Sequence, residues 1–398
     1  MKLKLFIRSL INIALIAFCL LLFSSPLKAQ VQLSDQSKIS LLTFGPGTEL
    51  YKVFGHSALR VQDHSQNLDL AFNYGTFDFN SNNFYWKFVR GDLKYWLSVT
   101  SYENMIEEYI ENDQTIYEQD FNLTASEKQA LFDRLHENFQ LANRFYVYDF
   151  FLDNCATRIR DIVYQEGAQL KDTVFYQQMT FRDAIDPYLA PVPWIDFVID
   201  ILLGYPADFV MTPAQYMFLP EFLAVGFAAT SINQTNPVPL IRDTQVLYQG
   251  KNTQLQARVF TPSLVFWLLL IPALFFFWRE RKYGLNYKVW NDAIVALCLI
   301  FGVIMLFLWF GTRHGATKWN YNLLWANPFY ILIWLPFFKK KNLRWWISIV
   351  FIGFIFTAMI SRAIGLLDFH VALFPLWLIL ITRWLKYAAE DDIIYDQY

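Results

Sequence analysis

One cysteine and one histidine of this chain have the types and surroundings that nucleophilic catalysis requires. Cys155 lies in DFFLDNCATRIRD, and His56 lies in VFGHSALRV between the small residues Gly55 and Ser57. A thiolate attacks carbonyl carbons when a nearby base takes the thiol proton, and an amide or carboxylate usually orients that base. The two residues are therefore a candidate nucleophile and a candidate general base.

The cysteine content of the chain leaves Cys155 without an obvious disulfide partner. The chain has three cysteines, of which Cys19 lies in an N-terminal apolar segment and Cys298 in a later apolar stretch. Exported domains usually carry paired cysteines, so a lone thiol in such a domain is unusual. The alternative interpretation is a buried cysteine that only fills the core.

A helix is predicted to position Cys155. Asp153 or Asn154 is a suitable N-cap, and the apolar residues that follow recur at helical spacing: Ala156, Ile159 and Val163. Cys155 then falls in the first turn of this helix. The unpaired backbone N–H groups and the positive end of the helix dipole favour a thiolate there.

A β-hairpin is predicted to position His56. An apolar strand precedes the Gly-Pro-Gly turn that ends at Gly47, and VFGHSALRV and LAFNYGTFDF flank a turn centred near Ser65. In that register His56 lies across from Asn73 or Tyr74, and a slip of one residue exchanges the two faces. We favour Asn73 as the orienting residue. The alternatives that remain open are Tyr74, Asp69 and His64.

Composition indicates an integral membrane protein. Of 398 residues, 55% are hydrophobic, 19% aromatic and only 17% charged, and the net charge is -2. This charge excludes the basic footprint of a nucleic-acid-binding protein. The sequence has neither paired metal-ligand motifs nor a glycine-rich nucleotide loop, so we expect no metal and no cofactor.

The N-terminal residues 1–29 resemble a secretory signal peptide, with an uncleaved signal anchor as the alternative. Lys2, Lys4 and Arg8 precede an apolar run from Leu10 to Phe23. Both interpretations export the chain from residue 30 onward. The sequence thus predicts an exported globular domain over residues 30–260.

Residues 261–398 are predicted to form a membrane domain with five spans and a cytoplasmic C-terminal tail. Basic residues concentrate in alternate connections, Arg279–Lys288 and Lys339–Arg344, which the positive-inside rule places in the cytoplasm. An odd number of spans then places the globular domain on the opposite side. The predicted spans are Pro262–Trp278, Ala293–Phe310, Leu323–Phe338, Trp345–Ile360 and Phe369–Leu385.

At FGHSALRV, FNYGTFDF and DNCATRIRD, in that order, the chain resembles the Lnb-type lipoprotein N-acyltransferases. The resemblance covers nearly the whole chain and extends to NYNLLWANP in the membrane part. It implies an α+β, permuted papain-like (NlpC/P60-like) exported domain, in which histidine precedes cysteine, followed by an all-α transmembrane domain of five helices. It also implies a bacterial inner-membrane location with the catalytic domain in the periplasm.

The resemblance implies Cys155 as nucleophile and His56 as general base, while Asn73 rests on the hairpin argument. The implied reaction moves an acyl chain from a membrane phospholipid, through a cysteine thioester, to the N-terminal amine of a diacylated lipoprotein. For Arg158, an ion pair with Asp161 is the favoured alternative to substrate binding. The candidate lipid- or substrate-binding residues are Arg158, Tyr74, Arg313, His314, Asn320 and Asn322.

Two other functions are compatible with the same residues. A membrane-tethered cysteine peptidase or amidase acting on cell-wall peptides would use the same pair with water as acceptor. A non-catalytic envelope scaffold would tolerate replacement of Cys155. The multi-span membrane part favours the acyltransferase, because wall amidases do not need it.

Overall fold

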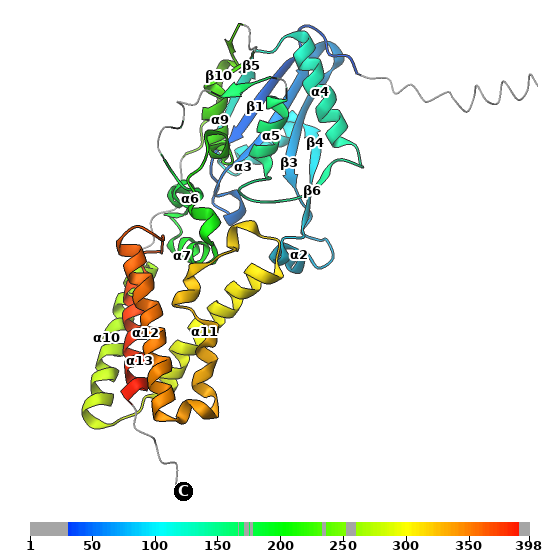
Figure 1. Ribbon diagram of the computed structural model, residues 1–398. Coiled ribbons are helices and arrows are strands. Elements are labelled where there is room, and N and C mark those ends of the chain that lie inside the picture. Colours follow the sequence, from blue (N-terminus) through cyan, green and yellow to red (C-terminus); the bar gives the residue numbers. More distant parts are fainter. Residues whose placement is uncertain are drawn as a thin grey trace, which may run out of the picture.

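The computed structural model describes residues 31–165, 167–170, 175, 178–232, 236–251 and 260–389. The predicted signal segment, residues 1–29, lies outside the described residues. The described chain forms a sheet domain above a helical region, and a smaller helical layer connects the two (Figure 1).

A seven-stranded antiparallel sheet organises the first part of the chain. Its strand order is β10-β5-β1-β2-β3-β4-β6, and every neighbouring pair is antiparallel. The strands are β1 (Lys38–Phe44), β2 (His56–Asp63), β3 (Leu68–Thr76), β4 (Lys94–Ser101), β5 (Ile116–Phe121), β6 (Phe145–Val147) and β10 (Ile241–Tyr248).

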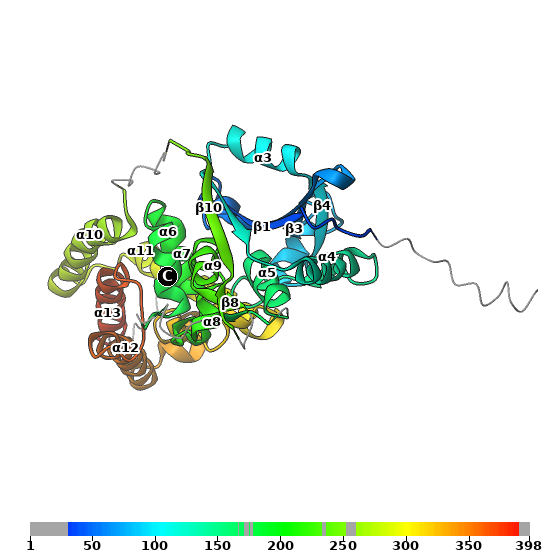
Figure 2. The same ribbon diagram turned by 90° about the horizontal axis from the view of Figure 1, so that it is seen from above.

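Helices cover both faces of this sheet. Helix α3 lies on one face, and α4, α5 and α9 lie on the other (Figure 2). The larger core is on the second face, where strand and helix residues such as Leu59, Leu97 and Ile159 are fully buried. The helix bounds are α3 (Tyr102–Glu111), α4 (Ala125–Phe139), α5 (Cys155–Tyr164) and α9 (Pro220–Ala228).

The predicted hairpin forms, and its register decides which side chains share a face. Leu59 pairs with Phe72, and a short 3₁₀ turn at His64–Gln66 joins the strands. Extending this ladder places Asn73 diagonally across from His56, while the next side chain, Tyr74, points to the opposite face. Of the two residues that the sequence left open at this point, Asn73 is therefore the one beside His56.

A helical layer lies between the sheet and the membrane region. It has its own core, in which Phe181, Leu189 and Phe218 are almost completely buried. Its helices are α6 (Phe181–Leu189), α7 (Pro193–Leu202) and α8 (Pro213–Tyr216), and a small sheet of β7 (Gln169–Leu170), β8 (Thr230–Ile232) and β9 (Val238–Pro239) lies nearby. The helical region starts at Pro262, and the predicted boundary near residue 260 stays a prediction.

Three helices among the described residues are long and apolar enough to cross a membrane. They are α10 (Pro262–Tyr283), α11 (Lys288–Gly311) and α12 (Lys341–Ala363). Another helix, α13 (Leu373–Ala389), packs against α10 and α12, and a buried ion pair of 3.1 Å between Arg383 and Glu280 ties it to α10. Helix α13 has 17 residues and is about 26 Å long at 1.5 Å per residue, which is short for a span.

The predicted helix over Leu323–Phe338, the third of the five predicted spans, is wrong. This segment is a series of short 3₁₀ helices, Tyr321–Leu324, Pro328–Trp334 and Pro336–Lys339. Pro328 and Pro336 lack a backbone N–H, so each removes a hydrogen bond from an α-helix that continued through this segment. The irregular backbone is tolerated because it packs against α11 and buries Trp325 and Tyr330 completely. The helical region therefore differs from the expected all-α bundle of five spans.

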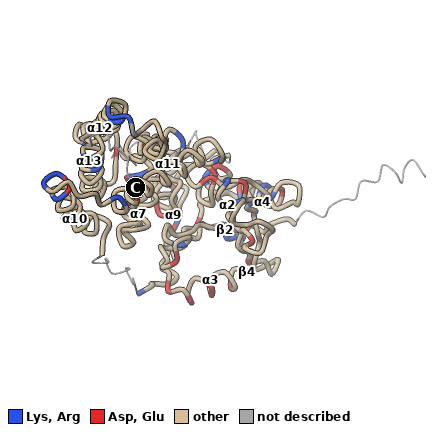
Figure 3. The backbone as a smooth tube through the Cα atoms, turned by 90° about the horizontal axis from the view of Figure 1, so that it is seen from below, with Lys and Arg blue, Asp and Glu red and all other residues tan. Residues whose placement is uncertain are grey.

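Basic residues gather at the end of the helical region that faces away from the sheet. Figure 3 shows this end from below, with Lys and Arg at the ends of α10 and α12. Arg281 and Lys282 lie in the last turn of α10, and Lys340 precedes α12. This distribution agrees with the orientation that the positive-inside rule predicts.

Candidate active site

Cys155 is the first residue of α5, and Asn154 is the cap that starts the helix. The Asn154 side chain accepts from the Thr157 N–H at 2.9 Å, and the Thr157 hydroxyl accepts from the Asn154 N–H at 2.8 Å. The Asn154 amide also donates to the carbonyls of Phe150 and Phe218 at 2.7 and 2.8 Å. Asn154 rather than Asp153 is thus the cap, and the start of the helix is firmly held.

His56 begins β2, and its ring has a fixed orientation. Its Nε2 lies 2.7 Å from the Oδ1 of Asn73, so this nitrogen donates to the amide oxygen. The ring packs 6.2 Å from the rings of Phe44 and Tyr109. The preceding Gly55 has φ +74°, and a Cβ there would lie 2.4 Å from the Phe44 carbonyl oxygen, so only glycine fits.

The Cys155 thiol and the His56 imidazole form a hydrogen-bonded pair. Burial alone raises the pKa of the Cys155 thiol, but the charge and hydrogen bond of His56 outweigh it and lower this pKa below its ordinary value. The backbone N–H groups of Ser57 and Ala156 add to this effect. Burial likewise lowers the pKa of His56, yet Cys155 and then Asn73 raise it above its ordinary value. Both shifts favour a thiolate beside an imidazolium.

Two residues that the sequence did not single out complete this neighbourhood. A Cβ at Gly75 would lie 3.7 Å from the Cys155 Cβ, 3.8 Å from the His56 Cε1 and 4.0 Å from the Tyr146 hydroxyl. Tyr146 is 7% exposed, and its hydroxyl has no hydrogen-bond partner among the described residues. The aromatic segment FYVYDF just before Cys155 was the available signal for Tyr146.

The other candidates for the orienting position lie elsewhere. Tyr74 is buried in the main core, and its hydroxyl accepts from the Asn138 amide at 2.9 Å. Asp69 pairs with the Arg60 guanidinium at 2.7 Å, and His64 is exposed in the hairpin turn. Asn73 alone among these candidates contacts the His56 ring in the described part of the chain.

Arg158 lies near the pair, but its expected ion-pair partner is wrong. The guanidinium forms two short contacts with the Asp153 carboxylate, at 2.5 and 2.7 Å, while Asp161 pairs with Arg160. The Arg158 guanidinium also lies 3.8 Å from the centre of the Tyr146 ring. Arg158 is therefore a cation one helical turn from Cys155, and the Asp153 carboxylate already balances its charge.

Arg313 and His314 hold a short helix, α2 (Phe84–Arg90), against the outer end of α11. The Arg313 N–H donates to the Arg90 carbonyl at 2.9 Å, and its guanidinium pairs with Asp92 at 2.9 Å. His314 Nε2 lies 3.1 Å from the carbonyl oxygens of Phe88 and Val89. These two candidates thus lie with α2, and no described contact brings them to the Cys155 thiol.

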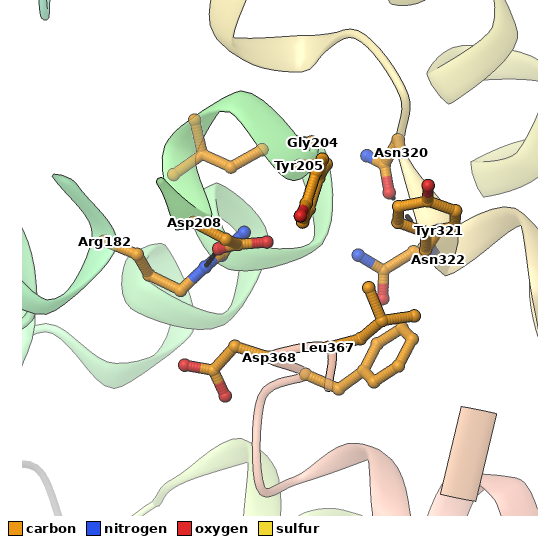
Figure 4. Close-up of a pocket in the computed structure, with 11 residues that line it drawn as sticks. Arg182, Gly204, Tyr205, Asp208, Asn320, Tyr321, Asn322, Leu367 and Asp368 are labelled. Atoms are coloured by element: carbon orange, nitrogen blue, oxygen red, sulfur yellow. Dashed lines mark hydrogen bonds and ion pairs between the residues drawn. The ribbon is translucent and has the colours of Figure 1, made fainter. Parts of the chain in front are cut away.

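Asn320 and Asn322 are buried where the 3₁₀ segment meets the end of α7. Asn320 donates to the Ile201 carbonyl at 2.8 Å, and the Asn322 Oδ1 accepts from the Trp325 indole at 2.7 Å. Figure 4 shows both beside a small pocket that Arg182 and Asp208 also line. Arg182 is 4% exposed and paired with Asp200 and Asp208, so the polar groups around this pocket mainly bind each other.

An acidic cluster lies close to this pocket. One carboxylate oxygen from each of Asp186, Asp196 and Asp200 lies within 4.8 Å of the others. Arg182 pairs with Asp200, and His370 lies 3.4 Å from Asp196. Burial, with the neighbouring Asp200 and Asp196, raises the pKa of Asp186 to about 7. The Arg182 guanidinium therefore balances part of this charge.

Comparison with models of protein families gives two matches that together cover most of the chain. The Lnb N-terminal periplasmic domain matches residues 23–186, and the Lnb transmembrane domain matches residues 254–390. No curated protein and no solved structure gives a match. The protein is thus a membrane protein whose sheet domain lies on the periplasmic side. Together, the matches and the fold identify the chain as a member of the Lnb family.

Proposed function

We propose that this protein is a lipoprotein N-acyltransferase that carries the acyl group on Cys155. The observation on which the proposal rests is the Cys155 thiol paired with His56, whose ring Asn73 orients. Since Asn73 engages Nε2, Nδ1 is the nitrogen left to take the thiol proton. The order of histidine before cysteine in the chain supports the permuted papain-like assignment of the sheet domain.

In the first step, the Cys155 sulfur attacks the ester carbonyl of a phospholipid. A C–S bond forms, the ester C–O bond breaks, and the proton taken by His56 passes to the departing glycerol oxygen. The products are a thioester acyl-enzyme and a lysophospholipid. The ester already carries the activated acyl group, so the step needs no other co-reactant.

In the second step, the N-terminal amine of a diacylated lipoprotein attacks the thioester. The C–N bond of the amide forms, the C–S bond breaks, and the amine proton returns through His56 to the Cys155 sulfur. Thioesters react with amines much faster than oxygen esters do, which suits this acceptor. Both substrates are anchored in the membrane, which accounts for a catalytic domain attached to membrane-spanning helices.

The oxyanion that forms in each step needs hydrogen-bond donors. The backbone N–H of Cys155 is one candidate, because it belongs to the unpaired first turn of α5. The Tyr146 hydroxyl is the second, because it is buried and unpartnered on the side of Gly75 that faces Cys155. Burial raises the pKa of Tyr146 well above its ordinary value, so the hydroxyl keeps its proton for donation.

The test is to isolate the acyl-enzyme. The purified protein is incubated with phospholipid and no acceptor, and the peptide that carries Cys155 is analysed by mass spectrometry before and after hydroxylamine. The expected result is an acyl adduct that hydroxylamine removes and that an added diacylated lipopeptide converts to its N-acyl form. An enzyme that turns over without such an adduct would contradict the thioester route.

The cysteine peptidase or amidase is distinguished by its acceptor and product. Cell-wall peptide would then be cleaved by the same Cys155 thiol, and lipoprotein N-termini would be unchanged by loss of the gene. Mass spectrometry of a lipoprotein N-terminus from cells with and without the gene separates the two functions.

A further inference from the structure

An unusual concentration of exposed aromatic residues lies on α2 and the loop before it. Tyr85 is 79% exposed, Trp86 55%, Phe88 53% and Phe79 57%. Exposed apolar groups clustered on one short segment indicate a binding surface rather than ordinary surface residues. Neither the proposed chemistry nor the family matches assign a role to this segment.

The position of α2 indicates what its exposed aromatic surface contacts. The Trp86 ring stacks 6.0 Å from the ring of Phe307, which lies in the membrane-spanning helix α11. Phe307 is four residues before the last residue of α11, so it lies about 6 Å inside the outer end of that span. Figure 1 shows α2 below the sheet, at the level of the outer end of α11. The aromatic side chains of α2 are therefore at the depth of the outer bilayer interface.

The exposed apolar surface of the span continues into that of α2. Phe310, in the last turn of α11, is 76% exposed, and Trp319 in the loop that follows is 59% exposed. Lys87 on α2 provides a cation between the aromatic residues, and Arg90 at the end of α2 pairs with Asp92 at 3.3 Å. Aromatic rings with interspersed lysine and arginine are typical of segments that lie in the headgroup region. A phospholipid surface fits this pattern, and it covers the adjoining face of α11 in any case.

Ring contacts also connect α2 to the proposed catalytic pair. Phe84, the inward residue of α2, lies 6.0 Å from Phe77, and Phe77 lies 5.1 Å from Tyr95. Tyr95 in turn lies 4.3 Å from Tyr148 and 6.5 Å from Tyr146, the residue beside Cys155. These ring contacts form a continuous packed path from α2 to the surroundings of Cys155.

We propose that the segment Phe79–Val89 is a membrane-contacting element that lies in the outer leaflet and presents donor phospholipids to Cys155. Arg313 and His314 serve this element by fixing α2 to the end of α11. The membrane contact is independent of the proposed acyl transfer, whereas the presentation of the donor rests on it.

The membrane contact is tested with a nitroxide label. Tyr85→Cys and, as a control, Val246→Cys are made in a Cys155→Ala background and reconstituted in vesicles of phosphatidylethanolamine and phosphatidylglycerol. Val246 is 55% exposed on β10, the edge strand on the opposite side of the sheet from β4 and β6. The label at 85 is expected to be accessible to lipid-soluble oxygen, and the label at 246 to a water-soluble nickel chelate. A water-accessible label at 85, as on a surface for a periplasmic protein, overturns the proposal.

The presentation of the donor is tested by the rate at which Cys155 becomes acylated. The double variant Tyr85→Ser/Phe88→Ser is expected to react about tenfold more slowly with vesicle phospholipid, and within about twofold of the parent with the soluble ester p-nitrophenyl butyrate. Val246→Ser should change neither rate. Equal slowing with both esters would overturn the proposal, because α2 would then act on the site itself. If the parent reacts with neither ester, the proposed acyl transfer fails, while a lipid-facing label at 85 still supports the membrane contact.

Discussion

The surroundings of the two described cysteines differ in what lies beside the sulfur. Cys155 and Cys298 are both free thiols with little exposure, 7% and 2%. Cys155 stands at the start of a helix beside His56, and backbone N–H groups of Ser57 and Ala156 point at its sulfur. Cys298 lies in the middle of α11 and lines a cavity whose other walls are apolar side chains.

This difference shows that burial alone does not separate a reactive cysteine from a core cysteine. Burial disfavours the thiolate at Cys155. The His56 imidazole and the helix N-terminus favour the thiolate of Cys155 despite this burial, whereas the residues that line the Cys298 cavity provide no such group. The four predictions below test that contrast, beginning with the largest effect.

Cys155→Ala is expected to abolish N-acylation, a loss of about 10³-fold or more, because it removes the sulfur proposed to carry the acyl chain. Cys298→Ala is the matched control and should stay within about twofold of the parent, since it removes one sulfur from an apolar site. N-terminal mass spectrometry of a lipoprotein from complemented cells measures both. Equal activity of the two variants would show that Cys155 is no more important for the reaction than Cys298.

His56→Ala is expected to lower acyl-enzyme formation by about 10²- to 10⁴-fold, because the thiol loses its base. The variant also removes the charge that lowers the pKa of Cys155, leaving burial to raise it. Alkylation of Cys155 at pH 7 should therefore become slower and should rise only at more alkaline pH. His136→Ala, on α4, is the control, and an unchanged alkylation profile in His56→Ala would contradict the pairing.

Local sequence signals predicted the backbone elements that carry Cys155 and His56. The Asx cap at Asn154 and the helical stripe that follows it placed Cys155 at a helix start, and the hairpin pattern placed Asn73 beside His56. These features depend on residues close together in the chain, where capping and strand pairing leave few alternatives.

Features that depend on distant contacts were not predictable in the same way. Tyr146 reaches the site because β6 pairs with β4, a pairing that has no local signature. Gly75 then has no side chain to separate the Tyr146 hydroxyl from Cys155. Arg158 pairs with Asp153 rather than with Asp161 because of the direction in which the Arg158 side chain runs across α5.

The membrane region shows a different limit of sequence interpretation. Apolar content predicted that Leu323–Phe338 spans the membrane as a helix, but apolar content does not distinguish an α-helix from a 3₁₀ segment. The prolines at 328 and 336 were the available signal, because each removes a backbone donor.

Tyr146→Phe is expected to slow acyl-enzyme formation by about 10²-fold if its hydroxyl donates to the oxyanion. The substitution removes only the oxygen and keeps the ring that packs against Arg158. Tyr74→Phe is the matched control, because its hydroxyl is bound by Asn138 in the core. Rates with a labelled phospholipid measure the effect, and a loss in Tyr74→Phe equal to that in Tyr146→Phe would argue against the donor role.

Asn73→Ala is expected to give the smallest of these losses, about tenfold, because Asn73 only positions the His56 ring. Its hydrogen bond raises the pKa of His56, so the variant should lower that pKa. The imidazolium that accompanies the thiolate is then lost at a lower pH, and the alkaline limb of the pH–rate profile should shift downward. Asn104→Ala, exposed on α3, should leave the profile unchanged. A tenfold loss without a shift in the profile would mean that Asn73 supports the fold of the hairpin rather than the ring, since a structural defect lowers the rate equally at every pH.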